Sequence, residues 1–100
     1  MMMSYFLTGS YQDQDNDFEL TIRKTEPSQY TVKLEDLTSC ENLVKESMQP
    51  EFASCLADLA DYMAENRIRL YGKNATSSPI DLQIDQELQN FIFSNTPDHL

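Results

Sequence analysis

The chain has 100 residues, 40% of them hydrophobic and 10% aromatic, which is typical of a single folded domain over residues 1–100 and excludes a disordered chain. Seventeen acidic residues against seven basic ones give a net charge of −10, and the acids are spread along the chain. Lys and Arg are needed to neutralise the phosphates of nucleic acids and of anionic membranes. The charge therefore argues against both as direct partners.

The N-terminal residues lack the basic segment and the long apolar core of a signal peptide, and no apolar run is long enough to span a membrane. We therefore expect a cytoplasmic protein in which Cys40 and Cys55 are reduced thiols. Cys55 falls on the flank of an apolar helical stripe, which favours a small buried side chain over a reactive one.

Three strands are expected in the N-terminal part of the chain. Residues 3–9 are rich in aromatic and β-forming types, and apolar residues alternate with polar ones over about 17–24 and 29–35. The polar links between these segments are short, so the strands should pair antiparallel. The first strand, with Tyr5, Phe6 and Leu7, has few charges to protect an open edge. This predicts a possible homodimer or partner contact along that sheet edge.

Two helices are expected next. Thr38-Ser39-Cys40-Glu41 has the spacing of a capping box, which predicts a short helix that buries Leu43, Val44 and Met48 and ends before Pro50. The main helix follows, with Phe52, Leu56, Leu59, Ala60 and Met63 on one apolar face. It covers about residues 50–66, ended by Asn66, or continues over 50–71; residues 67–71 also alternate as a strand would.

A C-terminal helix is expected over about residues 82–94, where Ile84, Leu88 and Phe91 share a face. Ser78 and Pro79 favour a helix start, whereas the alternation over residues 80–84 fits a strand equally well. The predicted fold is therefore α+β: a three-stranded antiparallel sheet covered by the main helix, with a short helix before it and a C-terminal helix.

No set of residues points to catalysis, a cofactor or a metal. The single histidine, His99, is next to the end of the chain, so neither cysteine has a base to activate it. Asp13, Asp15 and Asp17 stand at alternate positions like the first ligands of a calcium loop. Phe18 and Lys24, however, replace the glycine and the glutamate that such a loop needs. We expect a non-enzymatic protein.

The acidic face of the main helix is the candidate site. Glu51, Asp58, Asp61 and Glu65 fall together on the side opposite Phe52 and Met63. A rigid row of carboxylates can occupy a surface that normally binds nucleic acid. We expect an inhibitor or interaction protein that binds a basic protein partner, as some phage and mobile-element inhibitors do. In the alternative, an immunity- or chaperone-type protein binds through a sheet edge or apolar groove, and the charge only maintains solubility.

Overall fold

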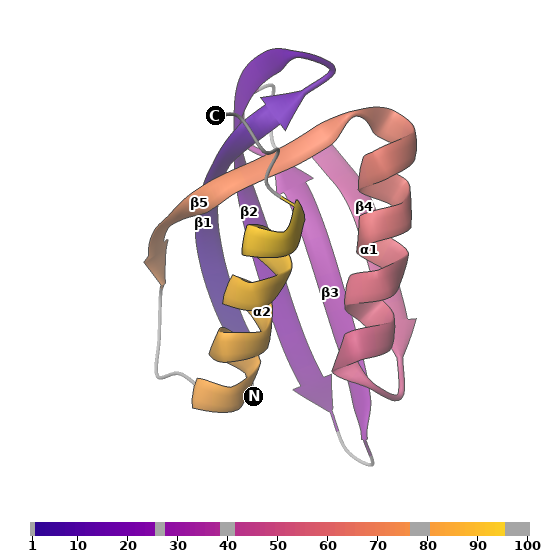
Figure 1. The fold of residues 1–100 in the computed structure, drawn as a ribbon. Helices are drawn as coiled ribbons and strands as arrows, with labels where there is room; N and C mark the ends of the chain where they lie inside the picture. The colour runs from indigo at the N-terminus through magenta and orange to yellow at the C-terminus, as the bar shows by residue number, and fades with distance from the viewer. Residues whose placement is uncertain (1, 26–27, 39–41, 77–80, 96–100) are drawn as a thin grey trace.

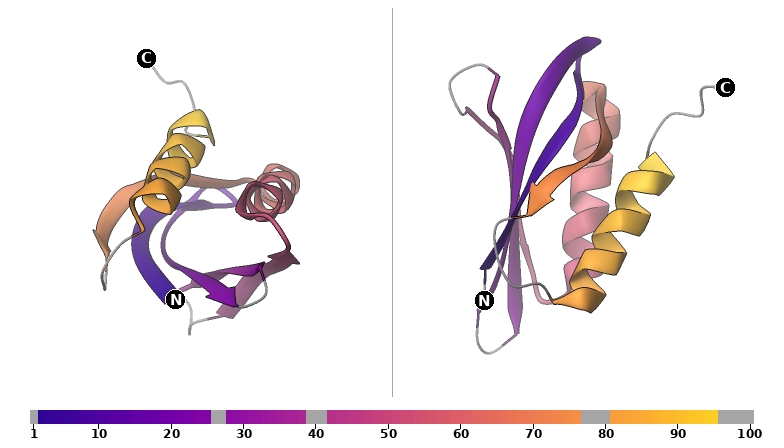
Figure 2. Two further views of the ribbon diagram at one scale, coloured as in Figure 1. Left: turned by 90° about the horizontal axis from the view of Figure 1, so that it is seen from below. Right: turned by 90° about the vertical axis from the view of Figure 1, so that its left-hand side faces the viewer.

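The computed structural model describes residues 2–25, 28–38, 42–76 and 81–95 (Figure 1). The elements follow in the order β1 (Met2–Tyr11), β2 (Gln14–Thr25), β3 (Gln29–Asp36), β4 (Asn42–Gln49), α1 (Phe52–Asn66), β5 (Ile68–Thr76) and α2 (Leu82–Asn95). The fold is α+β, as the sequence predicted: one antiparallel sheet with two helices on one of its faces (Figure 2).

The sheet has five strands in the order β4-β3-β2-β1-β5, and every neighbouring pair is antiparallel. The three predicted strands correspond to β1, β2 and β3 and are confirmed. The expectation of a three-stranded sheet is wrong, because β4 and β5 extend it on both sides. A tight turn joins β1 and β2, where Gln12 and Asp13 adopt positive φ angles of 52° and 71°.

The prediction of a short helix before Pro50 is wrong, because Asn42–Gln49 forms strand β4 along the free edge of β3. A helix of two turns is marginal on its own, whereas the edge of β3 offers these residues a ladder of hydrogen bonds along most of its length. Leu43 and Met48, expected in the core, are 56% and 59% exposed. The Thr38 hydroxyl accepts a hydrogen bond from the Asp17 backbone N–H at 2.8 Å, and the rest of the predicted capping box lies outside the described residues.

Helix α1 ends where the shorter prediction placed its end. Asn66 is the last helical residue, and Arg67 takes the left-handed conformation (φ 54°, ψ 50°) that reverses the chain. Residues 68–71 then form the first part of β5, so the helix does not continue to Tyr71. This is the strand alternative left open by the alternation of Ile68 and Leu70, which are both buried.

Strand β5 crosses the upper part of the sheet in Figure 1 and pairs with β1, so β1 is an interior strand. The prediction that β1 forms an open edge of the sheet is therefore wrong, and the edge strands are β4 and β5. The two backbones approach so closely that a Cβ atom at Gly9 would collide with the carbonyl oxygen of Arg69. Glycine at this position is what allows β5 to pair here.

The hydrophobic core lies between the sheet and the two helices (Figure 2). Strand β1 contributes Tyr5, and β2 and β3 contribute side chains of their predicted apolar alternation, among them Leu20 and Leu34. Helix α1 contributes Leu59 at its centre, and α2 contributes Leu88. The predicted C-terminal helix is confirmed, and its first turn is capped by Asp81, whose Oδ1 accepts the backbone N–H groups of Gln83 and Ile84.

Candidate functional site

The two layers of the fold differ in charge. We call α1 and α2, with Glu51 and Asp81 directly before them, the helical layer. It carries seven acids and no Lys or Arg: Glu51, Asp58, Asp61, Glu65, Asp81, Asp85 and Glu87. All seven bases of the chain lie in strands or at Arg67. The described strands and turns, which we call the sheet layer, also carry seven acids, so this described part of the chain is neutral (7 − 7 = 0).

On α1 the four predicted site residues do not form one equivalent row. Glu51, Asp61 and Glu65 are exposed, whereas Asp58 is half-buried against β4. The Asp58 carboxylate accepts hydrogen bonds from the Ser47 hydroxyl at 2.6 Å and from the Gln49 amide at 2.9 Å. These bonds lower its pKa. Asp58 therefore holds the helix to the sheet edge, and Asp61 and Glu65 point the remaining negative charge to solvent.

Helix α2 adds carboxylates in two environments. Glu87 faces the space between the helices, where it lines two neighbouring hollows. Asp85 instead lies beside Tyr5 of β1, to which it is hydrogen-bonded. Burial and this nearby carboxylate raise the pKa of Tyr5 to about 12. Asp85 is thus part of the attachment of α2 to the sheet, while Glu87 belongs to the outer acidic surface.

The space between α1 and α2 is a shallow apolar hollow of about 310 Å³. Leu56 and Phe91 lie in it with Ala53, and polar side chains of α2, including Glu87 and Asn90, line the opposite side. A second hollow of about 330 Å³ shares Ala53 and Glu87 and extends towards Glu51 at the start of α1. The helical layer therefore combines negative charge with a hollow lined in part by apolar side chains, although Leu56 and Phe91 are only 8% and 9% exposed.

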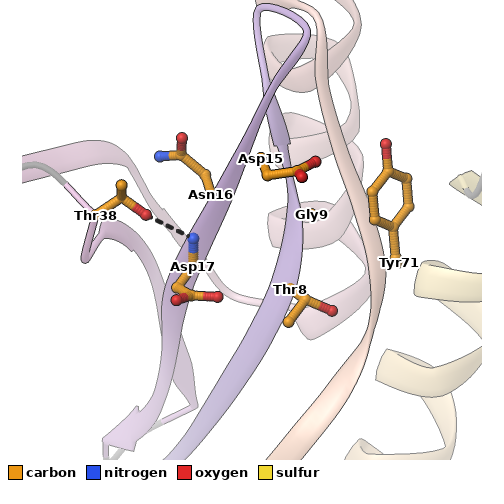
Figure 3. A pocket seen from close by; sticks show the side chains of 7 residues that line it. All are labelled: Thr8, Gly9, Asp15, Asn16, Asp17, Thr38 and Tyr71. Atoms are coloured by element: carbon orange, nitrogen blue, oxygen red, sulfur yellow. Dashed lines mark hydrogen bonds between the residues drawn. The ribbon is translucent and has the colours of Figure 1, made fainter.

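A different hollow, of about 430 Å³, lies on the opposite face of the sheet near the β1–β2 turn (Figure 3). Its lining residues are Thr8, Gly9, Asp15, Asn16, Asp17, Thr38 and Tyr71. Asp13, Asp15 and Asp17, which stand at alternate positions as calcium ligands would, lie in the turn and the first part of β2, and Asp13 pairs with Arg67 at 3.5 Å. Within the described ranges, no group of three or more His, Cys, Asp or Glu side chains is placed to hold a metal ion.

Cys55 is buried, as its position in the helical stripe predicted, and its Sγ contacts the carbonyl oxygens of Tyr30 and Ser47 at 3.5 and 3.6 Å. Burial raises the pKa of this thiol, which keeps it protonated and unreactive. Cys40 and His99 lie outside the described residues.

Comparison with known proteins gives no relative from which to transfer a function: no protein family matches the chain, and neither a curated protein nor a solved structure does. In the part of the chain that the structure describes, neither helix is long and apolar enough to cross a membrane. The fold and the surface define a small α+β protein with an acidic helical layer.

Sequence reasoning located the acids of α1 but missed the division of charge between the layers. A signal was present: the segments that become α1 and α2 contain no Lys or Arg. To recognise this signal, Lys45 and Arg69 had to be assigned to strands. Lys45 lies in β4, which was not predicted, and Arg69 lies in β5, which was predicted only as an alternative to helix. The hydrogen bonds of Asp58 depend on β4 and had no sequence signal.

Proposed function

We propose that the protein is a non-enzymatic binding protein whose helical layer docks onto a basic surface of another protein. The observation that supports this most strongly is the charge division: seven acids and no bases in the helical layer, against a neutral sheet layer. If the acidity served solubility alone, there would be no reason for all the bases to lie outside the helical layer. A surface of one sign steers a partner of opposite sign and orients it on encounter.

The spacing of the acids on α1 favours one kind of target, namely a protein surface that normally binds nucleic acid. Asp61 and Glu65 are one helical turn apart, which separates them by about 6 Å along the axis, and the adjacent phosphates of a nucleic-acid strand have a similar spacing. Two ion pairs join described residues, Lys33–Glu35 and Arg67–Asp13, and both lie outside α1 and α2. Asp61 and Glu65 take part in neither of them. An inhibitor that occupies a nucleic-acid site is therefore our preferred form of this function.

A second candidate follows from the hollow between the helices, which Leu56 and Phe91 line. In that case an apolar segment of the partner provides the binding energy, as in immunity- or chaperone-type complexes, and the acids provide solubility. Salt separates the two. Charge-driven binding weakens steeply as ionic strength rises, whereas apolar binding changes little.

The test uses a partner recovered by affinity capture and then purified. In one variant Glu51, Asp61, Glu65 and Glu87 are neutralised to Gln or Asn. Asp58 is kept, because its carboxylate is needed for the contact with β4. The matched control neutralises Asp13, Asp15, Asp17 and Glu46 of the sheet layer, which removes the same charge.

We expect the helical variant to slow association by about tenfold and to flatten its salt dependence, because long-range steering is lost. The sheet-layer control should retain most of the association rate. Equal losses in both variants would show that net charge matters and the helical layer does not. Unchanged, salt-independent binding in both would reject the electrostatic proposal and favour the apolar hollow.

A further inference from the structure

Neither α1 nor α2, the two helices of the described residues, lies on one whole face of the sheet. Both helices pack on the same side, and the opposite face is open in Figure 2. Side chains alternate along each strand, so the neighbours of the buried Met3, Tyr5 and Leu7 on β1 point to this uncovered face. Directly opposed residues of antiparallel strands share a face, so the register of the sheet identifies the rest of this surface.

The register arranges the uncovered face in rows across four strands. The arginine row is Met2, Arg23, Thr31 and Met48, and the glutamate row is Phe6, Glu19, Glu35 and Leu43. Between them lies a middle row of Ser4, Thr21, Lys33 and Glu46. Four residues along β2 separate Arg23 from Glu19, which is about 13 Å at the rise of a strand.

Two properties of these rows point to a partner. The arginine row and the glutamate row each have a large apolar residue at both ends, and these four are among the seven large hydrophobic side chains that are exposed in the described residues. Glu19 and Glu35 are also directly opposed on neighbouring strands. Like charges in this position are unfavourable. Lys33 lies 3.9 Å from Glu35 on the same face, and a further cation placed above the two glutamates would relieve the remaining repulsion.

We propose that this face is a homodimer interface, in which a second copy packs face to face with its strands running in the opposite direction. A two-fold axis along the middle row places the arginine row of each copy over the glutamate row of the other. Arg23 then meets Glu19 and Glu35 of its partner, while Met2 meets Phe6 and Met48 meets Leu43. The same surface patch therefore binds itself, and each of these contacts occurs twice, as a two-fold interface requires.

The net charge of −10 does not oppose this arrangement at close range, because the acids and bases of the described strands and turns balance. The acidic helical layers lie on the outside of the dimer, separated by two sheets that pack about 10 Å apart. The distance between the two acidic layers therefore exceeds the Debye length of about 8 Å at physiological ionic strength, so their repulsion is largely screened. The interface is independent of the proposed function, and it would leave both acidic layers free.

The test is sedimentation equilibrium of the full chain with the substitutions Arg23→Glu and Glu19→Arg, separately, combined in one chain, and mixed as two chains. We expect the wild type to dimerise and each single substitution to raise the dimer dissociation constant by about tenfold or more, because each creates two like-charge contacts. The combined variant and the equimolar mixture of the single variants should both dimerise again, since opposite charges are restored.

The control is Asp61→Arg on α1, which changes the net charge by the same amount as Glu19→Arg but should leave the dimer unchanged. If general repulsion controlled association, both of these substitutions would strengthen it. Circular dichroism should show every variant folded, because Arg23 and Glu19 lie outside the core. A wild type that stays monomeric up to millimolar concentration would overturn the proposal. So would a dimer that ignores both single substitutions, or a mixture that fails to reassociate.

Discussion

The carboxylate of Asp58 on α1 accepts a hydrogen bond of 2.6 Å from the hydroxyl of Ser47 on β4. Ser47 is a buried polar residue of β4, and Gln49 of the same strand donates to the same carboxylate oxygen. This pair joins the edge strand that the sequence did not reveal to the helix that it revealed most clearly. An acid that the sequence assigned to a partner surface is therefore needed for the fold.

Asp58→Ala should lower the melting temperature, whereas Asp61→Ala should not, because the Asp61 side chain is exposed. The effect should depend on pH. Hydrogen bonds from Ser47 and Gln49 lower the folded-state pKa of Asp58, so its stabilisation is present above the unfolded pKa near 3.8 and is lost as the pH falls through the folded value. Thermal melts between pH 7 and pH 2 should show the gap to wild type closing only in acid. A gap that is constant with pH would contradict this role.

Leu59 lies at the centre of the apolar face of α1 and is 1% exposed. Leu59→Asp places an unpaired charge in the core and should cost about 4 kcal/mol or more, which is enough to unfold a domain of this size. The control is Asp61→Lys, because Asp61 is exposed on the same helix. This substitution should leave the free energy of unfolding within about 0.5 kcal/mol of wild type. Denaturant titration followed by circular dichroism measures both. Equal stability of the two variants would show that the helix faces are assigned wrongly.

Periodicity was enough to predict β2, β3, α1 and α2, because each buries one face of a regular pattern, and composition was enough to predict β1. It failed for β4, whose sequence places Leu43 and Met48 on the surface and the polar Ser47 inside. The reason that this segment is a strand lies in its neighbour: the free edge of β3 supplies hydrogen bonds that no local pattern reports. The same dependence on neighbours explains why sequence alone grouped Asp58 with Asp61 and Glu65.

Gly9 should be the more sensitive of the two glycines in the chain. Gly9→Ala drives a methyl group into the backbone carbonyl of Arg69, and backbone cannot rotate away as a side chain can. We expect a loss of about 2–3 kcal/mol, at the upper end of the range for overpacking. Gly72 is the matched control in the paired strand β5, because a Cβ there meets no atom within 4 Å. Gly72→Ala should change stability by less than about 1 kcal/mol. Similar losses in both variants, measured by urea unfolding, would argue against the close approach of β1 and β5.

Tyr5 should make the fold sensitive to alkali. Burial and the neighbouring Asp85 carboxylate raise its pKa from 10.0 to about 12 in the folded protein. Below pH 10 the phenol is protonated in both folded and unfolded chains, so the stabilisation is complete. Between pH 10 and pH 12 the unfolded chain ionises first, which removes about 3 kcal/mol, at 1.36 kcal/mol for each pKa unit.

Tyr5→Phe isolates this contribution from those of the other tyrosines. The variant cannot ionise at this position, and at neutral pH it should be less stable than wild type because it also loses the hydrogen bond to Asp85. Its stability should then fall less steeply between pH 10 and pH 12, so the gap between the two proteins should narrow by about 3 kcal/mol. Urea unfolding at intervals across this range measures the gap directly. If the two curves run parallel, the Tyr5 phenol is not held neutral against Asp85, and another contact must attach α2 to β1.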